Sequence, residues 1–255
     1  MPTLSPQETI FFLCDVQTKF KPAIYNYSHV IETSNKMVKL AKVLNIPVLC
    51  TVQNQRGMHF ISYPCVLHIY RLCPSRPLIS TFCQALGPTD PDINLDSLGE
   101  LLLGPYNKSM FSMMIPEVRA VLDARPNLKS IVIFGIETHI CVLQTVLAIL
   151  ADGKYMPYLV ADGVSSCNSF EIPIALERVR SGGGVVTTSE SLAFELMRDA
   201  SLSNFKPFSN LIKEVKETTR LAGQALLQGQ VTPIAGESKE PAEIASGGVT
   251  LRSAM

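Results

Sequence analysis

Neither sign of charge is in excess in this sequence, because 22 lysine and arginine residues balance 22 aspartate and glutamate residues. No basic run exceeds two residues, so the chain lacks the lysine- and arginine-rich surface with which proteins bind nucleic acid. Charged residues make up only 17% of the chain, below the roughly 25% usual in globular domains, which predicts extensive burial. A chain of this length can bury a sizeable core in one domain without disulfides or metals.

Long apolar runs and targeting signals are also missing. The amino end has no charged segment followed by an apolar one, and no run approaches the roughly 18 residues of a membrane span. The seven cysteines are odd in number, and Cys14 and Cys50 lie in strand-like runs where a thiol behaves as a small apolar group. We therefore expect a cytoplasmic protein with free thiols that binds neither nucleic acid nor membranes.

Apolar, β-branched segments alternate along the chain with segments of helical period. Strands are expected at 9–15, 46–52, 130–135, 156–162 and 184–187, and helices at 28–45, 141–150 and 169–180. In the first helix, Ser28 is expected as the N-cap and Asn45 as a left-handed C-terminal residue. Strand followed by helix, repeatedly, predicts a mainly parallel sheet whose continuously apolar strands are covered on both faces. Right-handed crossovers then favour an α/β fold, a three-layer α/β/α sandwich with a doubly wound sheet.

Two segments do not fit this pattern. Residues 57–84 contain no aspartate or glutamate but three of the seven cysteines, and residues 231–255 are small, polar and aperiodic. We interpret 231–255 as a disordered tail and 57–84 as an irregular insert. Our hypothesis is that the insert is translated intron or another gene-model artefact, which sequencing the mature transcript would test. The domain is then expected at 6–213, followed by a C-terminal helix end at 214–230. The insert lacks the CxxC and HxxxH spacing of metal sites, and we predict neither metal nor cofactor.

Polar residues follow several of the expected strands, where ligands bind in open parallel sheets. Asp15 ends the first strand, Glu137 to Cys141 follow the strand at 130–135, and Asp162 ends the next. For Asp162 the preferred interpretation is a turn with Gly163.

Two further residues carry chemistry. Cys141 lies where a buried strand passes into an apolar helix, and free N–H groups and the helix dipole favour thiolate there. A buried structural cysteine is the alternative interpretation. Lys108 is a single charge among apolar and aromatic neighbours, so it is expected to need an anionic partner, for which Asp15 is a candidate. His139 should face a different side of the helical turn from Cys141, and no Cys–His pair is expected.

Three segments, in this order, carry a resemblance to a known family: IFFLCDVQTKF, LGPYNKSMFSM and FGIETHICVLQT. Together they resemble the isochorismatase-like cysteine hydrolase family, most closely its eukaryotic isochorismatase domain-containing subgroup, over about 6–208 outside the insert. The resemblance implies the isochorismatase-like hydrolase fold and an Asp–Lys–Cys catalytic triad made of Asp15, Lys108 and Cys141. Because family members often pair through helices, it also implies a homo-oligomer.

The same resemblance implies a cis peptide bond between Ile136 and Glu137. Backbone N–H groups of Cys141 and of Glu137 or Thr138 would then bind a developing oxyanion. Apolar and aromatic residues commonly line ligand pockets, and the candidates, which could equally be plain core, are Phe20, Tyr106 and Phe111.

These residues make a coherent hydrolytic mechanism. Asp15 would take the thiol proton, Lys108 would hold the carboxylate, and Cys141 would attack a carbonyl carbon. Gln53, Asn54 and Gln55 stand where metal-assisted family members carry an Asp-x-His and a further His. The sequence thus predicts a metal-independent cysteine hydrolase that acts on a small amide, carbamoyl or ester substrate through an acyl-enzyme. A catalytically idle binding protein and an isochorismatase-type vinyl-ether hydrolase are the alternatives.

Overall fold

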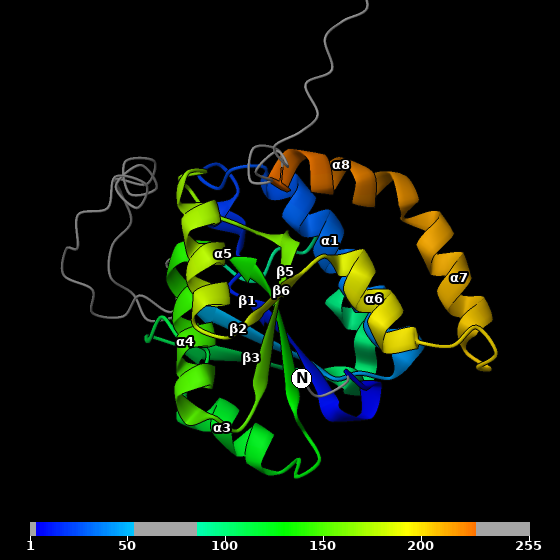
Figure 1. Ribbon diagram of the computed structural model, residues 1–255. Coiled ribbons are helices and arrows are strands. Elements are labelled where there is room, and N and C mark those ends of the chain that lie inside the picture. Colours follow the sequence, from blue (N-terminus) through cyan, green and yellow to red (C-terminus); the bar gives the residue numbers. More distant parts are fainter. Residues whose placement is uncertain (1–3, 54–85, 228–255) are drawn as a thin grey trace, which may run out of the picture.

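The computed structural model describes residues 4–53 and 86–227 (Figure 1). The expected insert at 57–84 and the expected tail at 231–255 lie outside these residues. Within the described chain, one sheet is enclosed by helices on both faces.

The sheet is parallel throughout and has the strand order β3-β2-β1-β4-β5-β6. Its strands are β1 (Thr9–Cys14), β2 (Val48–Gln53), β3 (Leu102–Lys108), β4 (Ser130–Ile136), β5 (Met156–Ser165) and β6 (Val185–Thr187). The chain winds outward from β1 to β3 and then from β4 to β6 in the opposite direction. The doubly wound sheet is thereby confirmed, and its topological switch point lies between β1 and β4.

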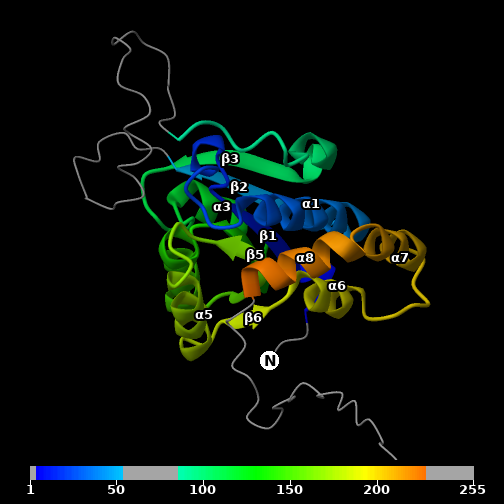
Figure 2. The ribbon, with the colours of Figure 1, turned by 90° about the horizontal axis from the view of Figure 1, so that it is seen from above.

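Two layers of helices complete the sandwich (Figure 1). One face carries α3 (Pro116–Asp123), α4 (Leu143–Asp152) and α5 (Glu171–Ser181). The other carries α1 (Tyr27–Leu44), α6 (Ser189–Met197), α7 (Phe205–Glu214) and α8 (Lys216–Leu227). Figure 2, at a right angle to the first view, shows the same division. The predicted three-layer α/β/α architecture is confirmed.

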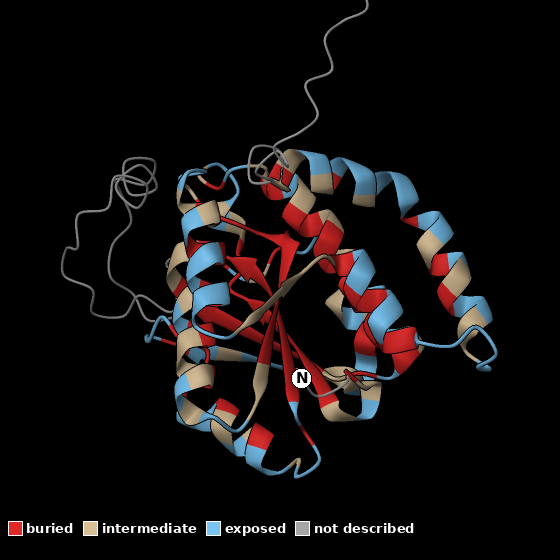
Figure 3. Cartoon of the chain, viewed as in Figure 1, coloured by how far each residue is buried: buried red, intermediate tan, exposed pale blue. Residues whose placement is uncertain are grey.

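The core explains why the central strands are apolar without interruption. Every residue of β1 is buried, as Figure 3 shows for the middle of the sheet. Phe11 packs into the apolar cluster under α1, whereas its neighbour Phe12 packs into the cluster under α4. Successive side chains of a strand point to opposite faces, so a strand between two helical layers needs apolar residues at every position.

The boundaries of α1 illustrate what local sequence signals determine. The helix ends at Leu44, and its C-cap residue Asn45 has the left-handed conformation with φ 55°, as predicted. It begins after Asn26, which is also left-handed, rather than after Ser28, so the predicted start was two residues late.

Asp162 corrects a prediction, because it neither ends a strand nor begins a turn. It lies inside β5, which extends to Ser165 past a register shift in its pairing with β4. Its carboxylate accepts hydrogen bonds from the Ser189 backbone N–H at 2.6 Å and from the Ser189 hydroxyl at 2.5 Å. Lys36 Nζ on α1 donates to the same hydroxyl at 2.9 Å. Asp162 therefore ties α6 to the sheet and to α1.

The C-terminal helices pack onto the sandwich. The expected boundary at 213 falls in the last turn of α7, and α8 lies against α1 and β5. Among the helices described, none combines the length and apolar character that a bilayer crossing requires.

Candidate active site

Asp15 stands at the carboxyl end of β1, beside the switch point of the sheet. Its backbone is left-handed, with φ 49°, and it is 1% exposed. Its Oδ1 accepts a hydrogen bond from Thr51 Oγ1 at 2.8 Å, and its Oδ2 lies 2.6 Å from Lys108 Nζ. A carboxylate so deeply buried needs such partners to offset the cost of its burial.

Lys108, the last residue of β3, supplies the opposite charge. Its Nζ also donates to Gln53 Oε1 at 2.6 Å and to the carbonyl oxygens of Met110, at 3.1 Å, and Phe111, at 2.9 Å. Burial opposes the charged form of Lys108, but the Asp15 carboxylate and the nearby thiols outweigh burial, so the pKa of Lys108 is raised above its ordinary value. The anionic partner expected for Lys108 is Asp15.

Cys141 lies in a π-helical turn (Thr138–Val142) that precedes α4. The prediction that it occupies the first turn of an α-helix was therefore wrong. The thiol of Cys14, the residue before Asp15, donates to Asp15 Oδ2 at 3.7 Å. Burial first, and the neighbouring Cys141 thiol second, raise the pKa of Cys14 well above its ordinary value. Cys141 also interacts electrostatically with Lys108. The structure thus gathers Asp15, Lys108 and Cys141 in one buried region.

The connection between β4 and the π-helical turn has unusual backbone and side-chain features. The peptide bond between Ile136 and Glu137 is cis, and the Glu137 carbonyl accepts from the N–H groups of Ile140 and Val142, both at 3.1 Å. The hydroxyl of Thr138 is buried and makes no hydrogen bond within the described residues. An unsatisfied buried hydroxyl is uncommon and marks this turn as a place where a polar ligand group could be accommodated.

The three aromatic residues expected in a pocket do not share one apolar cluster. Phe20 packs against the cluster beneath α1, and Tyr106 packs against the cluster on the opposite face. Phe111 is 38% exposed and contributes its carbonyl group to Lys108. Their role as substrate pocket stays a prediction.

Three polar residues of the site were not predicted. Thr51 and Gln53 bind Asp15 and Lys108 respectively, and Gln17 Oε1 accepts from the Gln53 N–H at 2.8 Å. Thr51 and Gln53 stand two apart in β2, so both point to the same face of the sheet. Polar residues at alternate positions near the end of an otherwise apolar strand were the signal that could have identified them.

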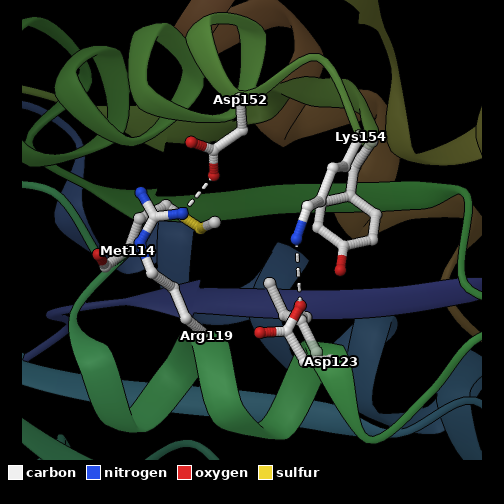
Figure 4. Close-up of a pocket in the computed structure, with 7 residues that line it drawn as sticks. Met114, Arg119, Asp123, Asp152 and Lys154 are labelled. Atoms are coloured by element: carbon white, nitrogen blue, oxygen red, sulfur yellow. Dashed lines mark hydrogen bonds and ion pairs between the residues drawn. The ribbon is translucent and has the colours of Figure 1, made fainter.

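A small cavity at the amino edge of the sheet is separate from this region (Figure 4). It lies between the ends of α3 and α4, where Arg119 pairs with Asp152 and Lys154 Nζ lies 3.2 Å from Asp123 Oδ1. Its volume of about 20 Å³ fits a water molecule at most, so it does not hold a substrate.

The buried thiol of Cys50 on β2 predicts a dependence of stability on alkaline pH. Burial above all raises the pKa of Cys50 to about 12, from an ordinary value of 9.0. Above pH 9 the unfolded chain therefore loses this proton first, and the folded state loses stability as pH rises toward 12. Between pH 8 and 10.5 we expect Cys50→Ala to lose about 2 kcal/mol less stability than the original protein. Urea denaturation at pH 8 and at pH 10.5 measures the free energy of unfolding of both proteins. Equal losses of stability in the two proteins would contradict the prediction.

A buried carboxylate, ammonium and thiol lie near the carboxyl ends of the strands of a doubly wound parallel sheet, the region where α/β proteins of this class bind ligands. A sequence model of the Isochorismatase domain matches residues 9–191, and the chain belongs to this family.

Similar proteins agree with this assignment. Isochorismatase domain-containing protein 2A of Mus musculus is 35% identical over 88% of this chain and 91% of its own length. The secreted isochorismatase effector Isc1 of Phytophthora sojae is 36% identical over 83% of this chain and 87% of its own. Among solved structures, the MAR1 ribonuclease from Caenorhabditis elegans is 27% identical, with a TM-score of 0.64 over 83% of this chain and 93% of that one. The octameric hydrolase YcaC from Escherichia coli, at 16% identity, shares the fold with a TM-score of 0.63 over 87% and 95%.

Proposed function

We propose that the protein is a cysteine hydrolase that cleaves a small amide, carbamoyl or ester substrate without a metal, through an acyl-enzyme on Asp15, Lys108 and Cys141. The observation that carries the proposal is the fully buried Asp15–Lys108 ion pair, with the Cys141 thiol close enough to interact with Lys108. Family membership supports hydrolytic chemistry. Gln53 stands where metal-assisted relatives are expected to carry ligands, and both its side-chain groups are occupied, by Lys108 Nζ and the Ser109 carbonyl.

The proposed reaction begins with proton transfer from Cys141 to Asp15. The sulfur then attacks the substrate carbonyl. The Lys108 ammonium holds Asp15 in position and stabilises the negative charge on the Asp15 carboxylate and the Cys141 sulfur. Backbone N–H groups of Cys141 and of Glu137 or Thr138 would bind the oxyanion, and one such donor typically contributes about 2.7–4 kcal/mol. Asp15 returns the proton to the leaving group, after which water hydrolyses the thioester.

A panel of small amides, carbamates and esters tests the proposal. We expect the purified protein to release ammonia or acid from at least one of them, and Cys141→Ala to lower the rate at least about 10³-fold because the nucleophile is lost. Cys50→Ala is the matched control, since Cys50 is also a buried, free cysteine but lies on β2 away from the reacting sulfur. Hydrolysis that survives Cys141→Ala would refute the acyl-enzyme.

Iodoacetamide distinguishes an active site from an idle one. Cys141 is only 8% exposed, whereas Cys167 is partly exposed, so access alone would make Cys167 the faster thiol. If Cys141 is an activated nucleophile, it should be labelled faster than Cys167 at neutral pH. Mass spectrometry of the two cysteine-containing peptides measures both labelling rates. Slower labelling of Cys141 would favour a binding protein without catalysis. Vinyl-ether cleavage that persists in Cys141→Ala would favour isochorismatase chemistry.

RNA hydrolysis is a second candidate, because the similar chain from Caenorhabditis elegans is described as a MAR1 ribonuclease. The balanced charge of this chain, 22 basic against 22 acidic residues, argues against strong binding of the phosphate backbone. An RNA substrate incubated beside the small-molecule panel separates the two, since only the ribonuclease would cleave it.

Location and assembly are further parts of the proposal. We keep a cytoplasmic location as a proposal, although the Phytophthora sojae relative is described as secreted. A homo-oligomer is favoured by the octameric state of the Escherichia coli hydrolase and by the exposed apolar residues Phe170 and Ile174 beside and on α5. Light scattering during gel filtration would measure the assembly.

A further inference from the structure

Three side chains of different ligand type meet at the carboxyl edge of the sheet, and none of them is required by the proposed triad. A carboxylate oxygen of Glu137, a ring nitrogen of His139 and the sulfur of Cys167 all lie within 4.8 Å of one another. Within 4–53 and 86–227 no other group of three or more His, Cys, Asp or Glu side chains is so close. Glu137 and His139 come from the turn after β4, and Cys167 follows β5.

Hydrogen bonds orient two of the three side chains. The Cys167 backbone N–H donates to Glu137 Oε2 at 2.8 Å, which fixes the carboxylate against the end of β5. Ser166 Oγ lies 2.9 Å from His139 Nδ1, which sets the ring and favours one tautomer. Metal-binding histidines and carboxylates are typically oriented by outer hydrogen bonds of this kind.

We propose that Glu137, His139 and Cys167 form a binding site for a divalent transition-metal ion, Zn²⁺ in the first place. A thiolate with an imidazole is the donor pair that zinc prefers, whereas calcium and magnesium select oxygen ligands. Zinc bonds of about 2.0–2.3 Å require ligand atoms roughly 3.3–3.8 Å apart, so atoms that lie within 4.8 Å of one another need to close by at most about 1–1.5 Å. His139 and Cys167 are partly exposed, which leaves a path of entry and an open coordination position.

The site is distinct from the group formed by Asp15, Lys108 and Cys141, yet it shares the turn that carries Cys141. Glu137 immediately precedes that turn, and its carbonyl accepts hydrogen bonds from two N–H groups within it. An ion here would therefore rest against the backbone that positions the thiol, without replacing any residue of the proposed triad.

Cobalt titration of the full-length protein tests the proposal, because Co²⁺ substitutes for zinc and gives a charge-transfer absorption when a thiolate binds it. We expect Cys167→Ser to bind one ion fewer than the original protein and to lose the matching absorption. Glu137→Gln and His139→Gln should weaken this binding at least tenfold. Ser166→Ala, which keeps all three ligands, should weaken it about 10–100-fold through the lost hydrogen bond to His139.

Two controls make the result specific. His29→Gln removes a histidine that pairs with Glu32 on α1, and Cys141→Ser removes the neighbouring thiol; neither should change the stoichiometry. Unchanged stoichiometry in Cys167→Ser, or loss of the ion in Cys141→Ser, would overturn the site, as would absence of cobalt binding to the original protein. If circular dichroism shows that Cys167→Ser does not fold, Ser166→Ala decides alone, and unaltered affinity in that variant refutes the proposal.

Discussion

Lys108→Met is expected to destabilise the fold by about 3–5 kcal/mol and to lower kcat/KM for a substrate of the protein about 10²–10³-fold. The stability falls because Asp15 would remain buried with its charge uncompensated, and breaking a buried pair on one side carries a penalty of this size. Activity falls because a preorganised cation beside the reacting groups is lost. Urea denaturation and steady-state kinetics measure the two effects separately.

The variant that changes both partners separates structure from catalysis. Asp15→Asn combined with Lys108→Met removes both buried charges, so it should regain most of the lost stability while remaining inactive. Lys154→Met is the matched surface control: its pair with Asp123 is more than half exposed, and its loss should cost less than about 1 kcal/mol. If Lys108→Met proved as stable as the original protein, the ion pair would have no structural role. Full activity in the double variant would exclude Asp15 as the base.

The architecture was predictable because its causes are local. Continuously apolar runs such as Thr9–Cys14 occur where helices cover both faces of a sheet, and the chain alternates such runs with helical periodicity. What failed depended on tertiary pairing. The sequence Asp162–Gly163 is typical of a turn, but the shifted register between β4 and β5 keeps Asp162 inside a strand. The π-helical turn around Cys141 has an amino-acid pattern that an α-helix would share.

Only part of the site was predictable from the sequence. Asp15 was expected at a strand end and Lys108 was expected to need an anion, but no strand was predicted at 102–108, where the structure has β3. That they lie 2.6 Å apart depends on the order β3-β2-β1, which sequence patterns do not specify. The cluster of Glu137, His139 and Cys167 was missed for the same reason, because its third member comes from the end of a different strand.

Gly135→Ala is expected to have the second large effect, a loss of about 2–6 kcal/mol of stability. Gly135 has φ 118°, and a Cβ there would lie 2.3 Å from the carbonyl oxygen of Cys14. The contact is with backbone, and Cys14 and Gly135 are partners in the β1–β4 pairing, so neither can move without separating the strands at the switch point. Strained backbone and overpacking each cost roughly 1–3 kcal/mol, and here they act together. Urea denaturation measures the change.

Gly153→Ala provides the matched control. Gly153 also has positive φ, 66°, but a Cβ there would meet nothing within 4 Å, so only the backbone strain of about 1–2 kcal/mol is expected. The difference between the two variants isolates the close approach of β4 to β1. That approach brings the turn bearing Cys141 beside Asp15, so a folded remnant of Gly135→Ala should also lose activity. Equal stability of the two alanine variants would mean that β1 and β4 can part at their carboxyl ends at little cost, and the position of Cys141 would then depend on the π-helical turn alone.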